Sequence, residues 1–195
     1  MGVVYAQRGF GLRFSSDLNY FYKASEYHLV DGTFSNIVLG VFAKSYNKYG
    51  GLERGFNFCY KPKSGLPLVA KDFADNQQTS LLSWEAEFRC GPRILKYFYP
   101  KLGFILGYRV NNAGFLKANA PPEYKISKWY TAIPLGFSID LPLRFGNTGI
   151  GFFYDVGLSK VIPIPSLSID YSPRMRAFNF EITVMVGDNG KNEEK

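Results

Sequence analysis

The chain contains little cysteine, a single histidine and no long hydrophobic run, and each shortage excludes a class of protein. Its 195 residues include two Cys and one His, which is too few for a disulfide-stabilised scaffold or a His/Cys metal site. The longest apolar run, residues 37–43, falls short of the ~18–20 residues that a membrane-spanning helix needs. We therefore expect no disulfide framework, no bound metal or cofactor, and no helical membrane protein.

The positive charge is also not concentrated in any segment. Lys and Arg total 23 against 16 Asp and Glu, giving a formal net charge of +7. These basic residues form no run, and the sequence carries no helix-turn-helix, zinc-finger or RNA-binding signature. We expect no nucleic-acid partner, which leaves lipid phosphate as the anionic partner to consider.

Aromatic residues and glycine are abundant. The chain contains 18 Phe, 14 Tyr, 2 Trp and 20 Gly, a composition that favours strands and tight turns over helices. Aromatics also gather near the expected strand ends, where they would form the interfacial girdles of a membrane barrel. These residues are Tyr20, Tyr22, Tyr60, Tyr97, Tyr99, Tyr108, Trp129 and Tyr171.

A period of two in hydrophobicity is the main structural signal. From residue 10, even positions such as Leu12 and Phe14 are mostly apolar, whereas odd positions such as Arg13 and Asp17 are mostly polar. This alternation indicates a strand with one apolar face. The same pattern recurs over residues 37–44, 52–60, 82–89, 102–110, 129–141, 150–158 and 177–186. Most of the resulting eight strands would span roughly 25 Å when tilted by ~40°.

The connections between these strands alternate in length. Residues 46–51, 91–96 and 144–148 are short connections. The long connections are residues 24–35, 62–80, 111–128 and 162–173. This is the layout of an all-β, eight-stranded antiparallel up-and-down transmembrane β-barrel with short periplasmic turns and long extracellular loops. We assign residues 7–187 to the barrel, residues 1–6 to a signal-peptide remnant with Val4 and Ala6 before its cleavage site, and residues 188–195 to a polar tail.

The polar face of the strands carries the candidate functional residues. If the apolar face meets lipid, these charges face the lumen as a network of opposite signs. The predicted network is Arg13, Asp17, Glu53, Glu85, Glu87, Arg89, Arg109, Asp140, Asp155 and Glu181. Because seven acids outnumber three Arg, some acids need Lys or solvent as partners. Glu85 and Glu87 share a strand face and form a nominal acid–base pair, but we expect ion pairs rather than a catalytic site.

The expected loops and cysteines give three further predictions. Basic residues in or beside the long loops are candidate contacts for lipopolysaccharide phosphates: Lys61, Lys63, Lys71, Lys117, Lys125 and Lys128. His28, with Ser25, Ser35 or Ser80 as nominal partners, represents the alternative of a lipid A-modifying enzyme. Cys59 and Cys90 fall on opposite faces of adjacent strands, so we predict two free thiols.

Several segments resemble the PorT-like outer-membrane β-barrel family. They are residues 130–135 (YTAIPL), 149–157 (GIGFFYDVG) and 178–187 (FNFEITVMVG). The resemblance implies an eight-stranded barrel in the bacterial outer membrane, in a family some of whose members are associated with protein secretion. We expect a non-enzymatic anchor or accessory component of an envelope complex, in contact with outer-membrane lipid, lipopolysaccharide and other envelope proteins. The alternatives are a lipid A-modifying enzyme, a narrow channel and a soluble lipocalin-like carrier with inverted faces.

Overall fold

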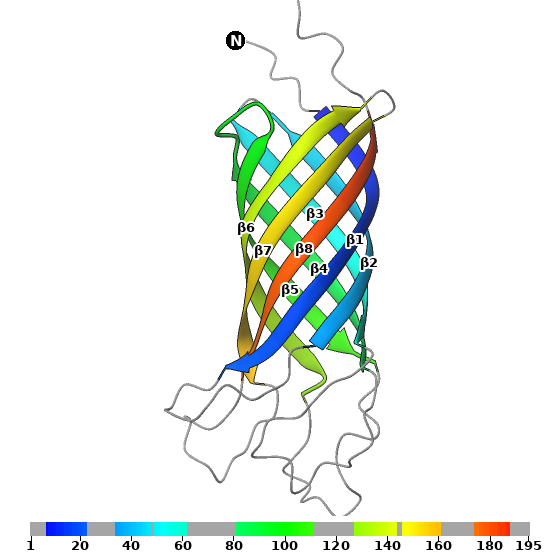
Figure 1. The fold of residues 1–195 in the computed structure, drawn as a ribbon, viewed down its shortest axis with the longest axis vertical. Helices are drawn as coiled ribbons and strands as arrows, with labels where there is room; N and C mark the ends of the chain where they lie inside the picture. The colour runs from blue at the N-terminus through cyan, green and yellow to red at the C-terminus, as the bar shows by residue number, and fades with distance from the viewer. Residues whose placement is uncertain are drawn as a thin grey trace, which may run out of the picture.

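The protein folds as a single closed barrel of eight antiparallel strands (Figure 1). The computed structural model describes residues 7–22, 34–47, 49–61, 81–110, 127–143, 146–160 and 174–187. The strands are β1 (Gln7–Tyr22), β2 (Phe34–Tyr46), β3 (Gly50–Lys61), β4 (Leu81–Pro92), β5 (Phe98–Arg109), β6 (Trp129–Leu143), β7 (Gly146–Lys160) and β8 (Arg174–Gly187). Each strand pairs with its neighbours in sequence, and β1 closes the barrel on β8. The predicted fold class is confirmed.

The short connections all lie at one end of the barrel, which we call the turn end. β2, β4 and β6 end there, each before a short turn, and β1 begins and β8 ends at the same end of the barrel (Figure 1). In the first of these turns, the Asn47 side chain accepts hydrogen bonds from the backbone amides of Tyr49 (2.8 Å) and Gly50 (2.9 Å). Such a side-chain contact stabilises a tight reversal of the chain. The opposite end, where the other four connections leave the strands, is the loop end.

The alternation in the sequence becomes an alternation between the outer face and the interior. Phe10 is 72% exposed and Leu12 is 54% exposed, whereas Arg13 is 1% exposed. The same division holds around the barrel, because large apolar side chains of every strand lie on the outer face. No helix long and apolar enough to cross a membrane occurs in the part of the chain that the structure describes.

The outer face carries very few charges. Among the strand residues whose side chains are described, its charged members are Arg8, Arg54 and Arg176. Arg176 lies near the loop end and donates a hydrogen bond of 3.0 Å to the Tyr154 hydroxyl. Arg8 and Arg54 lie toward the turn end. Aromatic and aliphatic side chains cover the middle of the barrel between these two levels.

The expected aromatic girdle is formed in part. Trp129 is 57% exposed, and its ring centroid lies 4.9 Å from that of Tyr108 near the loop end. Tyr99, however, was placed wrongly in the girdle: it is buried inside the barrel, 4.9 Å from the ring of Tyr46. The even positions of β5 face outward, so the odd position of Tyr99 directs its side chain inward. Tyr171 and the side chains of Tyr20 and Tyr22 lie outside the described residues.

Candidate functional site: the charged interior

Arg13 is at the centre of the barrel interior. From β1 it donates hydrogen bonds to Glu53 of β3 and Glu87 of β4, and its Nε atom lies 3.3 Å from Glu181 Oε2 of β8. Each of these four side chains is at most 3% exposed. One guanidinium therefore links three carboxylates from three strands, which uses the several donors of an arginine.

Two further ion pairs cross the full width of the barrel. Arg89 of β4 lies 2.6 Å from Glu181 of β8, measured from Nη1 to Oε2. Lys44 of β2 lies 3.2 Å from Asp140 of β6, measured from Nζ to Oδ1. In the strand order of the closed barrel, β4 faces β8 and β2 faces β6. Side chains thus bridge the interior along two different diameters.

The buried charges of this region balance. Lys101 of β5 completes the group, with its Nζ atom 2.9 Å from Glu53 Oε2. We call the set the central ion-pair cluster: Arg13, Lys44, Arg89, Lys101, Glu53, Glu87, Asp140 and Glu181. It contains four cations and four anions, so it is neutral as a whole. Such balance matters because an unpaired buried charge is very costly.

The remaining predicted lumen residues lie closer to the loop end. Asn36 donates an amide hydrogen bond of 3.4 Å to Asp17, and Asn179 donates one to Asp155. Each amide is a neighbour from an adjacent strand. The other two predicted residues, Glu85 and Arg109, both contact a single aromatic side chain, described next. The structure therefore places all ten predicted residues inside the barrel, but at two levels and with different partners.

Tyr130 contacts both Glu85 and Arg109. Its hydroxyl donates to Glu85 and lies 3.1 Å from the Ser83 hydroxyl, while the Arg109 guanidinium lies over its ring at 4.5 Å from the centroid. The ring packs against Gly107, its partner across the β5–β6 pair, where any β-carbon would overlap it. Only glycine fits at that position, and the aromatic ring covers it.

An aromatic layer closes the interior at the turn end. Phe42, Tyr46, Tyr99 and Met185 form a buried apolar cluster. The Tyr46 hydroxyl donates to Asp140, which joins this layer to the central ion-pair cluster. From the turn end to the loop end, the interior thus consists of an apolar layer, the neutral central ion-pair cluster and a group of polar side chains.

Sequence reasoning missed several of these inward side chains. Lys44 and Lys101 are members of the cluster that were not named among the candidates. Lys44 could have been found, since it continues the inward row of Val38 and Phe42. Lys101 and Tyr99 lie before residue 102, where the predicted strand began, so their parity was not considered. The excess of predicted acids over Arg was the available signal for such lysines.

The other candidate residues are only partly visible. Cys59 is buried and Cys90 exposed, and neither forms a disulfide, as predicted. Glu87 is bonded to Arg13 and Arg89 rather than to Glu85. Within the described strands no group of three or more His, Cys, Asp or Glu could hold a metal ion.

The predicted loop residues are described only in part. Lys128 is exposed just before β6. The residues outside the described part of the chain are His28, Ser25, Ser80, Lys63, Lys71, Lys117 and Lys125, together with the side chains of Ser35 and Lys61. Residues 1–6 and 188–195 lie outside this part as well.

A closed antiparallel barrel with an apolar outer face and paired charges inside has the design of a transmembrane β-barrel. No protein-family model and no curated protein matches the chain. Among solved structures, the chain is similar to Ail, the attachment invasion locus protein of Yersinia pestis, in its crystal structure with the heparin analogue sucrose octasulfate. The two share 14% sequence identity over 94% of this chain and 97% of that chain, with a TM-score of 0.41.

Proposed function

We propose that the chain is an integral protein of the bacterial outer membrane, and that it serves as a non-enzymatic anchor or accessory component of an envelope complex. The observation that carries the location is the inversion of the barrel. Large apolar side chains of all eight strands are exposed, whereas twelve charged side chains of the described residues, among them the central ion-pair cluster, are buried or half-buried inside. Monomeric soluble proteins rarely expose apolar patches beyond a few hundred Å².

The same inversion argues against a soluble lipocalin-like carrier. Such a barrel keeps an apolar interior for its ligand and presents charges to water. Here the ion pairs Arg89–Glu181 and Lys44–Asp140 bridge the interior. Its apolar part is the tightly packed layer at the turn end that contains Tyr46 and Tyr99. An apolar ligand would have to displace buried ion pairs to enter.

The anchoring role rests on how the interior is used. The ion pairs Arg89–Glu181 (2.6 Å) and Lys44–Asp140 (3.2 Å) cross the interior along two diameters. Packed side chains therefore fill the space that a channel would need. With a lipid-facing outer wall, the surfaces left for protein partners are the two ends of the barrel. The resemblance to PorT-like barrels supports a partner in protein secretion, and we propose this as the complex to be tested first.

Fractionation combined with a heat-shift gel tests the location. We expect the full-length protein in the outer-membrane fraction, migrating faster in SDS when unboiled, because a closed barrel held by β1–β8 pairing resists the detergent. Partners are then sought by mild-detergent co-purification from the same membranes. Recovery in a soluble fraction, with the same migration before and after boiling, would contradict the proposal.

Planar-bilayer recording separates an anchor from a narrow channel. We expect the purified barrel to show no stable conductance steps, because side chains of the central ion-pair cluster meet across the interior. A lipid-inserted protein of known open conductance provides the control for insertion. Reproducible nanosiemens steps from the pure protein would show that the interior opens, and the channel alternative would replace the anchor.

A further inference from the structure

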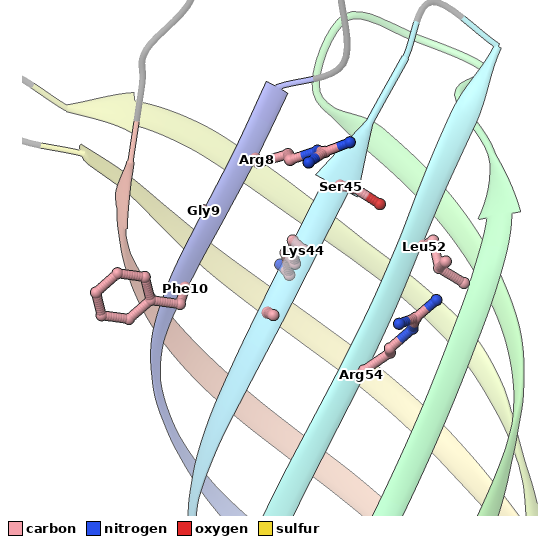
Figure 2. A pocket seen from close by; sticks show the side chains of 8 residues that line it. Arg8, Gly9, Phe10, Lys44, Ser45, Leu52 and Arg54 are labelled. Atoms are coloured by element: carbon pink, nitrogen blue, oxygen red, sulfur yellow. The ribbon is translucent and has the colours of Figure 1, made fainter.

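A basic depression lies on the outer wall near the turn end, between β1 and β3 (Figure 2). It has a volume of about 610 Å³. Two rows of outward-facing residues build it: Arg8, Ser45 and Leu52 in the row nearer the turns, and Phe10, Ala43 and Arg54 in the next. The outward side chains of the middle strand are the small ones of Ala43 and Ser45, whereas the Lys44 side chain points inward, so the wall is hollow between the larger flanking side chains.

The two arginines of this depression are available to a ligand. Neither Arg8 nor Arg54 has a hydrogen bond or ion pair with another residue in the part of the chain that the structure describes. Both are exposed. The Ser45 hydroxyl, in the same row as Arg8, is a neutral donor beside them. The depression therefore offers two guanidinium groups and a hydroxyl without any acidic side chain, which is a donor set suited to a phosphate.

An apolar depression of about 630 Å³ continues from the basic one toward the middle of the barrel. The two share Phe10, Ala43 and Arg54. The other outward side chains that line it are Leu12, Val41, Phe56, Val184 and Val186. A charged depression next to the barrel end, joined to an apolar one nearer its centre, matches the two parts of a phospholipid.

The depth of Arg54 needs an explanation in any case. It lies four residues beyond the start of β3 at Gly50, which is about 10 Å along the barrel axis at ~3.3 Å per residue and ~40° tilt. Arginine on a lipid-facing wall costs progressively more toward the midplane. In Figure 2 its side chain extends from β3 toward the turn end, as expected for a charged group reaching for the headgroup level.

We propose that this surface is a binding site for one phospholipid of the periplasmic leaflet, with its phosphate between Arg8 and Arg54 and an acyl chain along the apolar depression. The inference rests on the proposed outer-membrane location, in which the turn end is periplasmic. The site lies at the opposite end of the barrel from Lys128, the described candidate contact for lipopolysaccharide in the other leaflet. The phosphate and the acyl chain of the lipid occupy two adjoining depressions that share Phe10, Ala43 and Arg54.

Native mass spectrometry of the refolded full-length barrel tests the site with dioleoylphosphatidylglycerol as the probe. We expect a one-to-one adduct that dioleoylglycerol, which lacks the phosphate, does not form. The R8Q/R54Q variant should bind roughly tenfold more weakly or worse, because it loses two charge-assisted contacts. In the variant A43L, the larger side chain fills the space where the two depressions join, while both arginines remain. This variant should lose the adduct as well.

The matched control is R176Q, which removes the outward arginine of the loop end and should bind phosphatidylglycerol as the unaltered chain does. Each variant is first run unboiled in SDS, so that only closed barrels are compared. Equal adducts from R8Q/R54Q and the unaltered barrel would overturn the site, as would a preference for lipid A over phosphatidylglycerol. Loss of the heat shift in the unaltered chain would instead overturn the proposed function.

Discussion

Replacing Arg13 with Met is expected to lower the free energy of unfolding by about 3–5 kcal/mol, the usual cost of removing one partner from a buried ion pair. Arg13 is 1% exposed and bonded to both Glu53 and Glu87, so its loss leaves two carboxylates without a shared counter-charge. Methionine keeps most of the side-chain volume, which limits any cavity. The measurement is unfolding of the barrel by guanidinium chloride in phospholipid vesicles, monitored by tryptophan fluorescence.

Two variants separate the ionic contribution from general damage. R176M makes the same change at an outward arginine near the loop end and should cost less than about 1 kcal/mol. In R13M/E87Q the stranded Glu87 carboxylate is neutralised, so part of the lost stability should return, with a coupling energy of about 0.5–3 kcal/mol. If R13M proved as stable as R176M, the central ion-pair cluster would not be a stabilising element.

The strand pattern could be predicted because it depends on neighbouring residues alone. Leu12 and Arg13 occupy opposite faces of any strand through residues 10–22, whatever that strand pairs with. The choice of face followed from the cost of charges in lipid, which assigns Arg13 to the interior. The eight strands and the interior position of the ten candidate residues needed no more than these two arguments.

The pairing of those residues could not be predicted, because it depends on how the strands shift along one another as the barrel closes. Arg89 and Glu181 are 92 residues apart, and they meet only because β4 and β8 face each other at the right height. Strand ends have the same dependence. Lys101 belongs to β5 because it pairs with Gly136 of β6, whereas the predicted strand began one residue later.

Glycine shows a further limit of sequence reasoning. Gly107 lies on the inward face of β5, but nothing in the sequence indicated that the Tyr130 ring packs against it. The space left by the missing β-carbon lets Tyr130 point inward, where its hydroxyl reaches Glu85. A residue without a side chain therefore determines where a neighbouring side chain binds, and this is visible only once the β5–β6 register is known.

The decisive experiment on the environment of the outer wall compares one substitution at two depths. Leu39 lies near the middle of β2 and is 46% exposed, and Leu141 lies near the turn end of β6 and is 43% exposed. In a bilayer, L39R should lower the free energy of unfolding by about 2–4 kcal/mol and L141R by only about 0–1 kcal/mol. The difference arises because the Leu141 position allows the guanidinium to reach the headgroups.

Neither leucine takes part in the interior, so the comparison reports on the surroundings of the wall and not on packing within it. The titration used for R13M, in the same vesicles, provides the measurement. If the outer wall instead faced water, both arginines would be solvated, and both variants would stay within about 0.5 kcal/mol of the unaltered barrel. A larger loss of unfolding free energy for L39R than for L141R therefore requires lipid around the barrel. Two equal and small losses would instead support the alternative of a soluble carrier.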